Sequence, residues 1–587
     1  MTEKKQSAKV FEFSGGEKVA PEKNSKSIQE QVQELAQSQI QEVEDDNDEY
    51  SKVIHPESGI TKSDACAALG TGELGLGKLF VKLNRNRFCY NTDKKSWYKF
   101  NGYLWVLDER KEVFDGVRYL YEVLQYALRE HMDGLKNATR EAYVKNLFSL
   151  RNINKMEQIL KQARTGRDGL GVPDQWFDNH LQYIGADNGV IDLHSGKLLA
   201  GDPEMYITKK VGCDFNEDAP EPVQFKTFLE SIFKYPLERN KSELSDEDFN
   251  LSCKAESENL ISFLQRLFGY MLLGSCREHI FLVLYGPKGR NGKGELSRIM
   301  IKVFGDYGGD IAADQLTLSS FNRDSSGSSE DIMYLKDKRL VIASETKQGA
   351  LFDTSFIKRS TGGDSLVGRH NHGKQMTFAP THTTCLQTNF IPNAPSEEDA
   401  FFSRLLIIPF FRHFCLTPDP GDIYQSPIDL KIDEKLAGEM PGLLKWVVDG
   451  ALMYQKEGLK KPAGVLKIVD DYKKDRDIFQ EFIDEFCDVD SKRKERTTPF
   501  HKAFNQFLKD NGHSKPFQAK TIGNRLEHKG FVRRKITGNW HYLGIILNIN
   551  GVDLIGDERH LNLSADHYII TESTALDGDH DDFSIDD

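Results

Sequence analysis

The sequence predicts an α/β protein whose centre is a parallel β-sheet with helices packed against it. Short apolar runs alternate with helical patterns between about residues 276 and 470, which is typical of parallel strands joined by helices. The clearest run, 281–285, reads Phe-Leu-Val-Leu-Tyr, and a helical pattern follows over 295–303. A glycine-rich turn with a lysine joins the two, and this is the architecture of a phosphate-binding loop.

The turn carries the residues that a polyphosphate requires. Its glycines let backbone N–H groups curl around phosphate oxygens, the helix N-terminus adds a positive dipole, and Lys293 reaches the outer phosphates. The spacing departs from G-x-x-x-x-G-K-[ST], because Gly286 lies one residue too far from Gly292 and Gly294 replaces a magnesium-binding hydroxyl. On the motif alone, a chance glycine turn before a helix is the alternative. The predicted ATP-binding residues are Gly286, Pro287, Lys288, Gly289, Arg290, Asn291, Gly292, Lys293 and Gly294.

Polar residues end the next two predicted strands. One strand ends in Ser344 and Glu345, about fifty residues beyond the turn, and the next ends in Asn389. Because parallel strands present their carboxyl ends at one edge of a sheet, we expect these side chains to lie near the phosphate-binding loop. An acidic residue there is the expected partner for Mg²⁺ and for an attacking water. A fourth strand follows directly after Arg404.

The regions before the sheet mix strands and helices. The sequence predicts strands at 81–90 and 97–107, helices from 113 to about 163, strands and turns at 176–198, and helices at 223–275.

Composition indicates a globular protein of a reducing compartment. Hydrophobic residues make up 39% and charged residues 28% of the 587 positions. No apolar run approaches the length of a membrane span, and no signal peptide opens the sequence. The eight cysteines are scattered without a C-x-x-C pair, which favours free thiols over disulfides or a structural zinc site. We therefore expect a cytoplasmic protein.

The strongest positive charge lies near the C-terminus. Residues 491–545 hold thirteen Lys and Arg against three Asp and Glu, a net charge of +10, although the whole chain carries −13. Two helical patterns and a basic hairpin predict a winged helix, and the charge is typical of DNA binding. A winged helix that docks a protein is the alternative, since a fold does not fix a function. The DNA-binding candidates in this region are Lys520, Arg525, Arg533, Arg534 and Lys535.

Five short motifs follow one another in a fixed order through the second half of the chain. They are Gly286…Asn291-Gly-Lys293, the strand 339–345, Lys358…Asp364…Arg369, Thr388–Pro392 and Asp399–Arg404. In this order they resemble the superfamily 3 helicases, and in particular the poxvirus and satellite-phage primase–helicase branch used by phages and plasmids. The stretch 176–214 is similar to the domain that precedes the ATPase in that branch. The resemblance covers about residues 80–545.

The resemblance implies an AAA+-like P-loop ATPase core and assigns catalytic roles to four residues. Lys293 would bind the β- and γ-phosphates, and Glu345 would orient or activate the attacking water. Asn389 would be the polar sensor of that water or of the γ-phosphate. Arg404 would be an arginine finger offered to the ATP of the neighbouring subunit, which implies a hexameric ring.

The resemblance also implies a hairpin that lines the pore of the ring and touches single-stranded DNA. Its candidate residues are Arg369, His372 and Lys374. One departure concerns the metal, because Ser344 stands where many related ATPases have an aspartate. The candidate Mg²⁺ ligands are therefore Glu345 and Ser344, with the metal keeping more of its water.

The predicted organisation has six parts. They are a disordered or linker tail at 1–75, an α+β domain of the primase–helicase type at 76–222, a helical collar or linker at 223–275, a superfamily 3 ATPase domain at 276–470, a winged-helix domain at 471–550 and an acidic disordered tail at 551–587.

These features predict an ATP-dependent replicative DNA helicase of a phage or mobile element, with ATP and Mg²⁺ as cofactors, in the bacterial cytoplasm if a phage encodes it. Expected partners are single-stranded and forked DNA, origin DNA, further copies of the chain in a hexamer, and host or phage replication proteins, with no membrane. One alternative is a replication initiator that uses ATP only to assemble. Another is a bifunctional primase–helicase, although the region before residue 223 shows no obvious paired-carboxylate metal site.

Overall fold

A computed structural model describes the chain over residues 53–55, 59–130, 135–234, 246–318, 329–369, 375–395, 398–475, 477–511 and 516–556. These residues form two compact units. The first contains the described residues up to Lys99 together with Leu107–Asp174, and the second contains Phe100–Val106 and the described residues from Gln175 onward. The stretch 175–222, which the sequence analysis grouped with residues 76–174, thus packs within the second unit.

The first unit is a helical bundle with a small sheet at its side. Its helices are α3 (Lys62–Gly70), α4 (Glu73–Asn84), α5 (Val113–Glu130), α6 (Asn137–Ser149) and α7 (Ile153–Ala163). Its strands are β1 (Val53–His55), β2 (Ile60–Thr61), β3 (Phe88–Asn91), β4 (Ser96–Phe100) and β6 (Gly171–Val172). Strand β3 pairs antiparallel with β4 and parallel with β6.

The strand predicted at 81–90 is wrong over its first half. Residues up to Asn84 belong to α4, and the strand begins only at Phe88. The reason is the spacing of Leu76, Leu79 and Phe80, which are fully or almost fully buried in one core and continue the apolar face of the helix. The predicted helices between 113 and 163 are confirmed as α5, α6 and α7.

The second unit contains the predicted parallel sheet. Its strands are β10 (Phe281–Tyr285), β11 (Gly308–Ala312), β12 (Leu340–Ser344), β15 (Thr383–Thr388) and β16 (Leu405–Pro409). Their order is β11-β12-β15-β10-β16, and each neighbouring pair is parallel. Strand β10, which starts the glycine-rich turn, therefore lies inside the sheet, with β15 and β16 as its neighbours.

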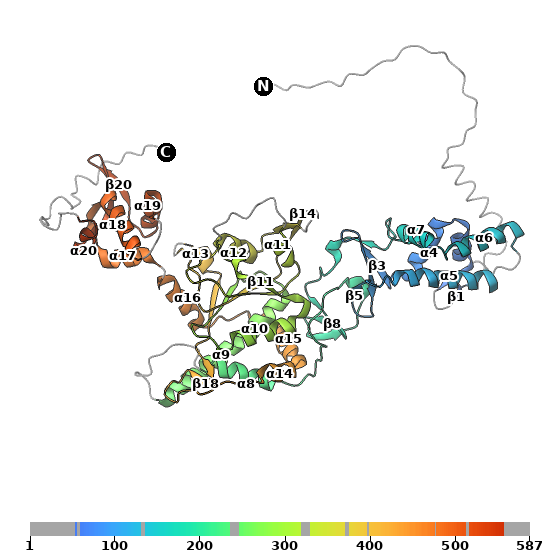
Figure 1. Cartoon of the computed structure of the whole chain (residues 1–587), viewed down its shortest axis with the longest axis horizontal. Coiled ribbons are helices and arrows are strands. Elements are labelled where there is room, and N and C mark those ends of the chain that lie inside the picture. Colours follow the sequence, from blue (N-terminus) through green and yellow to red (C-terminus); the bar gives the residue numbers. More distant parts are fainter. Residues whose placement is uncertain are drawn as a thin grey trace, which may run out of the picture. The chain divides into compact units, whose positions relative to one another are not determined.

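Helices cover both faces of this sheet (Figure 1). Alternate residues of β10 enter two different cores, because successive side chains of a strand point to opposite faces. Leu282 and Leu284 pack in a core with α8 (Val223–Ile232), α9 (Asp246–Leu273), α10 (Lys293–Phe304) and α15 (Met440–Glu457). Phe281 and Val283 pack in a core with α12 (Thr354–Thr361), α13 (Asp399–Phe402) and α16 (Ala463–Asp475).

Shorter elements complete this part of the chain. They are β5 (Trp105–Leu107), β7 (Tyr183–Ala186), β8 (Gly189–Asp192), β9 (Lys197–Leu199), α11 (Glu330–Tyr334), β13 (Leu366–Arg369), β14 (Gln375–Phe378), β17 (His413–Cys415), β18 (Gln425–Pro427) and α14 (Ile432–Ala437). Strands β7, β8 and β9 form an antiparallel sheet, and β13 and β14 form an antiparallel hairpin.

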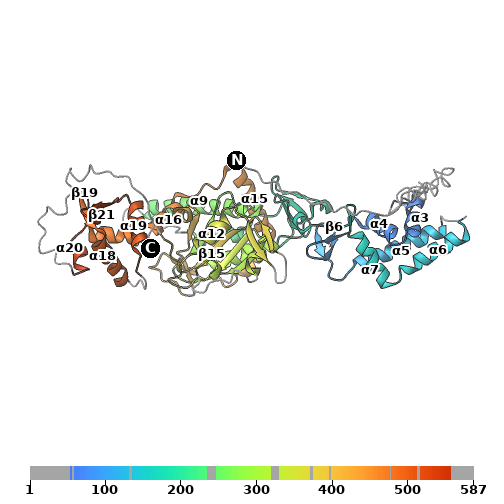
Figure 2. The same ribbon diagram turned by 90° about the horizontal axis from the view of Figure 1, so that it is seen from above.

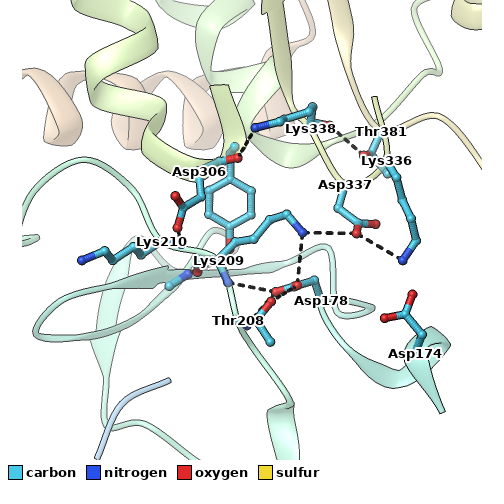
Figure 3. A network of polar contacts seen from close by, with 12 residues as sticks. Asp174, Asp178, Thr208, Lys209, Lys210, Asp306, Lys336, Asp337, Lys338 and Thr381 are labelled. Atoms are coloured by element: carbon cyan, nitrogen blue, oxygen red, sulfur yellow. Dashed lines mark hydrogen bonds and ion pairs between the residues drawn. The ribbon is translucent and has the colours of Figure 1, made fainter. Parts of the chain in front are cut away.

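A partly buried polar network holds the chain after β9 against the amino-terminal ends of β11 and β12 (Figure 3). Lys209 Nζ lies 3.4 Å from Asp178 Oδ2 and 3.2 Å from Asp337 Oδ2, and Tyr307 Oη donates to the Lys209 carbonyl at 3.1 Å. Burial lowers the pKa of Lys209, but the two carboxylates outweigh this effect and raise it above its ordinary value. The network fixes residues 178–210 on the edge of the sheet opposite to the glycine-rich turn.

The C-terminal region is smaller and has its own core. It contains α17 (Ile478–Phe486), β19 (Cys487–Arg496), α18 (Thr497–Asp510), α19 (Ala519–His528), β20 (Arg533–Ile536), β21 (Asn539–Leu547) and α20 (Ile549–Asp553). The strands form an antiparallel sheet in the order β19-β21-β20, of which β19 and β21 are labelled in Figure 2. The two helices and the hairpin predicted from the sequence are present, whereas β19 was not predicted.

Candidate nucleotide-binding site

Three chain segments that were expected to form a site meet at the carboxyl edge of the parallel sheet. The glycine-rich turn follows β10, Ser344 and Glu345 lie where β12 ends, and Asn389 follows β15. The register aligns Tyr285 with Thr388 on the neighbouring strand, so the two strands end level with each other. In parallel α/β sheets, ligands bind in this position.

Lys293 is the first residue of α10, and only 4% of it is exposed. Its Nζ donates to the Gly286 carbonyl at 3.0 Å and to Asn389 Oδ1 at 2.9 Å. Burial disfavours the charged ammonium and lowers the pKa of Lys293 to about 8. A cation held in a buried position at a helix N-terminus, and hydrogen-bonded to two neutral oxygens, is ready to exchange them for phosphate oxygens.

Two of the glycines are required by the shape of the turn. A Cβ on Gly286 would lie 2.1 Å from Asn291 Nδ2 and 3.0 Å from Lys293 Nζ. Gly292 has φ +89°, and a Cβ there would lie 2.7 Å from Ile232 Cδ1. Asn291 Nδ2 in turn donates to the Lys288 carbonyl at 2.7 Å and so closes the turn on itself. An added side chain would collide with Asn291 at Gly286 and with Ile232 at Gly292.

Gly289 does not follow this rule. A Cβ added there meets no atom within 4 Å. Its neighbour Arg290 adopts φ 56°, a left-handed conformation uncommon for a residue with a side chain. Steric crowding therefore requires glycine at positions 286 and 292 but not at 289.

Glu345 is exposed and strained. Its φ is 61°, and its backbone N–H donates to the Gln387 carbonyl at 3.0 Å. A non-glycine residue in this region costs about 1–3 kcal/mol and persists only where its surroundings hold it there. The strain turns the chain directly after β12, with the exposed Ser344 as the last residue of the strand.

The structure adds Gln387, which sequence reasoning missed. A Cβ built on Gly294 meets only Gln387 Nε2 within 4 Å, at 3.9 Å, so the space where a hydroxyl was expected opens toward this amide. Gln387 is also the register partner of Ser344 on the adjacent strand. The available signal was a polar residue inside the run Thr-Thr-Cys-Leu-Gln-Thr.

Arg404 lies apart from these residues. It precedes β16, and its carbonyl accepts a hydrogen bond from the N–H of Phe281, the first residue of β10, at 2.7 Å. It therefore lies at the amino edge of the sheet, opposite to Lys293. Its Nε is buried and has no hydrogen-bond partner within the described part of the chain. A Cβ on Gly362 would lie 3.8 Å from Arg404 Nη2 and 3.6 Å from Asp364 Oδ2. The two charged side chains therefore both lie next to Gly362.

The candidate DNA-binding residues lie on two hairpins. Arg369 ends β13, where its backbone N–H donates to Ser329 Oγ at 3.0 Å. His372 and Lys374 lie outside the described residues. On β20, Arg533, Arg534 and Lys535 are exposed in succession.

Two further basic residues of the C-terminal region lie on α19. Lys520 is exposed, whereas Arg525 stacks over the ring of Phe517 at 4.5 Å and is half-buried. On the hairpin, the guanidinium of Arg533 lies 4.6 Å from the ring centre of Trp540, whose side chain is 45% exposed.

The described residues contain neither a candidate metal cluster nor a candidate membrane span. Across the described ranges, no three His, Cys, Asp or Glu side chains are grouped so that they would hold a metal ion. None of the helices that the structure describes is both long and apolar enough to cross a bilayer.

One protein family matches part of the chain, and viral proteins match a larger share of it. Residues 77–234 match the family described as "D5 N terminal like". The chain is 24% identical over 465 residues to a putative helicase of Acanthamoeba polyphaga mimivirus, a match covering 75% of this chain and 46% of that protein. It is 23% identical over 405 residues to a putative helicase of Sputnik virophage, covering 65% of this chain and 46% of that protein. The chain thus spans about half the length of the curated relatives it matches.

Two solved structures of the C-terminal region of NrS-1 also match, with TM-scores of 0.39 and 0.40 and 10% sequence identity. They cover 81% of this chain and 100% and 99% of the NrS-1 chains. Fold and site together define an α/β protein with a polar site at the carboxyl edge of a parallel sheet. The family match and the viral relatives confirm the resemblance to the poxvirus and satellite-phage primase–helicase branch of superfamily 3.

Proposed function

We propose that this chain is an ATP-dependent DNA helicase that acts in the replication of a virus, phage or mobile element. The observation that carries the proposal is Lys293, a buried lysine at the N-terminus of α10 that contacts both the glycine-rich turn and Asn389. The relatives named putative helicases and the D5 N-terminal-like match give this site its context.

The residues of the carboxyl edge would divide the work of phosphoryl transfer. The loop 286–294 would cradle the phosphates with backbone N–H groups, and Lys293 would pair with the outer ones. On nucleotide binding, Asn389 would give up its hydrogen bond with Lys293 and would instead hold the γ-phosphate or the attacking water. Glu345 would orient that water. Mg²⁺ bound with the nucleotide would neutralise phosphate charge, with Ser344 and Glu345 as its candidate protein contacts.

The position of Arg404 supports a ring. It lies at the edge of the sheet opposite to Lys293, so it cannot serve the phosphates of its own chain without a rearrangement of the sheet. Supplied to a neighbouring chain, it would stabilise the charge of the transition state. We infer a ring from this position, and the resemblance to superfamily 3 helicases implies that the ring is a hexamer.

The C-terminal region would be a winged helix that contacts DNA. Helices α18 and α19 and the hairpin β20–β21 supply the required elements, and the exposed side chains of β20 give it a positive surface. We infer non-specific phosphate contact from this charge.

A strand-displacement assay on forked DNA, run beside an ATPase assay, tests the proposal. The parental chain should unwind the fork only with ATP, and Lys293→Ala should abolish both ATP turnover and unwinding. Lys302→Ala is the matched control, because it removes an exposed lysine of the same helix whose ion pair with Asp433, at 3.5 Å, lies on the surface. ATP-dependent assembly on DNA without unwinding would support an initiator instead, and unchanged turnover in Lys293→Ala would reject the site.

A further inference from the structure

The first unit contains a basic groove that the proposed function does not use. It lies between α4 and the end of α7, two helices that run side by side in both views (Figures 1 and 2). The hollow has a volume of about 630 Å³. Its charged lining residues are Lys78, Lys82, Arg85, Arg167 and Asp168, four cations against one carboxylate.

The groove exists because α4 and α7 approach closely at a glycine. A Cβ on Gly77 would lie 2.8 Å from the Cβ of Gln162, so only glycine permits this approach. The chain after α7 then turns at Gly166, which has φ +83° with no atom within 4 Å of an added Cβ. Residues 165–169, at this turn, line the side of the groove opposite to α4.

The cations form a row along one side of the groove. Lys78, Lys82 and Arg85 are four and three residues apart, so they share one face of α4. At 1.5 Å per residue the row is about 10 Å long, with steps of about 4.5–6 Å between cations. Arg85 Nη2 also donates to the Asp168 carbonyl at 2.7 Å, which ties the helix to the opposite wall and fixes this guanidinium in the groove.

We propose that this groove binds the phosphate backbone of single-stranded nucleic acid, as a site separate from the nucleotide site and from the C-terminal hairpin. A row of cations in a concave hollow fits one phosphodiester chain, whereas a duplex is a cylinder whose phosphates lie on its outside. The lining residues include no aromatic side chain. The contact is therefore with the backbone rather than with stacked bases, and it does not depend on sequence. This inference does not rest on ATP hydrolysis.

The test uses Lys78→Ala/Arg167→Ala in the full chain, because both side chains are exposed and neither is a cap or core residue. Lys82 is left intact, since it pairs at 2.6 Å with Asp64, which caps α3. Arg140→Ala/Lys145→Ala is the matched control, with the same loss of charge on exposed positions of α6 outside the groove. Each protein is titrated without nucleotide against a labelled oligothymidylate and the corresponding duplex, over a range of salt concentrations.

The groove variant should lose about 1.4 units from the slope of log K against log salt for the single strand, about 0.7 for each phosphate contact. At about 0.1 M salt this corresponds to roughly 25-fold weaker binding. The α6 control should keep the parental slope. To remove the hairpin's contribution, the comparison is repeated with Arg533, Arg534 and Lys535 replaced by alanine, and the same difference in slope is expected.

Four results would overturn the proposal. They are an unchanged slope in the groove variant, an equal loss in the α6 control, a loss confined to duplex DNA, and displacement of the oligonucleotide from the groove by stoichiometric inorganic triphosphate. The last would assign the groove to a nucleotide. Because the titration contains no ATP, a failed strand-displacement assay leaves its outcome unaffected, and the two proposals can fail separately.

Discussion

Lys293 Nζ and Asn389 Oδ1 are 2.9 Å apart, and this hydrogen bond joins the first turn of α10 to the end of β15. It links the segments that follow β10 and β15, two neighbouring strands, at the carboxyl edge of the sheet. Because Asn389 is a neutral partner, it does not compensate the desolvation of the lysine, whose pKa falls to about 8. Lys293 is thus a buried cation with a neutral partner, and a phosphate group would bind it more strongly.

This lowered pKa predicts a pH dependence of ATP binding. Phosphate favours the charged lysine, so the complex has a higher Lys293 pKa than the free protein. Below about pH 8 the free lysine is already protonated, and its contribution to affinity is constant. Above about pH 8 binding must take up a proton, so affinity should fall by up to about tenfold per pH unit. Calorimetric titration between about pH 7 and 9.5 measures this, and Lys293→Arg should show a flat profile because arginine stays charged. A flat profile in the parental chain would contradict the prediction.

Glu345 offers a test that separates its carboxylate from its backbone strain. Glu345→Gln should bind ATP normally and lose roughly 10²–10⁴ in turnover, since an amide cannot accept the proton of the water. Glu345→Gly should lose the same activity but gain about 1 kcal/mol in the free energy of unfolding, because glycine relieves the φ of 61°. Denaturant unfolding beside single-turnover hydrolysis distinguishes them. Full activity in either variant would remove Glu345 from the site.

The open space at Gly294 predicts a gain of metal affinity. Gly294→Ser would restore a hydroxyl at the N-terminus of α10, where an added Cβ meets only Gln387 Nε2 at 3.9 Å. The Mg²⁺ concentration for half-maximal ATPase activity should decrease severalfold. Gly294→Ala supplies the control, with the Cβ but without the hydroxyl, and should leave this concentration unchanged. Equal shifts in the two variants would assign the effect to helix stability alone.

Arg404→Ala should retain nucleotide binding and lose roughly 10³–10⁵ in turnover, as expected for an arginine finger. Mixing it with Lys293→Ala should restore part of the hydrolysis, because each variant supplies the half-site that the other lacks. Hydrolysis against mixing ratio is the measurement. Mixed assemblies, shown by differently tagged chains, that remain inactive at every ratio would contradict a shared site.

The exposed basic residues of β20 predict a salt-dependent DNA contact. Replacing Arg533, Arg534 and Lys535 with alanine should flatten the salt dependence of DNA binding by about one unit for each duplex phosphate contact. DNA-independent ATPase activity should stay near the parental value. The titration is done without nucleotide on forked DNA. Parental slope and affinity in this variant would indicate that the C-terminal region docks a protein.

The sequence predicted four of the five strands of the central sheet, and β10, β12 and β16 were the clearest because they are short, mainly apolar runs. Strand β11 was not predicted, because its residues, Gly-Gly-Asp-Ile-Ala, are mostly small or polar. Strand β10 and helix α10 lie where the periodicity placed them, and Glu345 and Asn389 reach the same edge because parallel strands share their direction. The same reasoning failed at α4, where Phe80 and Val81 favour a strand by local propensity and tertiary packing makes them helical.

Other features are beyond the reach of a single sequence. The strand β19 is highly charged, and it pairs with β21 about fifty residues later in the chain, a contact that local periodicity does not encode. Gln387 belongs to the site through its register with Ser344 and its approach to Gly294, both of which are tertiary. The groove of the first unit likewise depends on the packing of Gly77 against α7.

The opposite placement of Lys293 and Arg404 gives each chain a front and a back. Under the proposed function, a contact from front to back is head-to-tail, so it ends only by closing a ring. Each chain then contributes to two active sites, with Lys293 in its own site and Arg404 in the site of its neighbour. A chain without Lys293 silences one site, whereas a chain without both residues silences two, its own and its neighbour's. Such a double variant would inhibit the rings into which it assembles. An isolated chain would not hydrolyse ATP, and hydrolysis would begin only at chain concentrations that allow assembly.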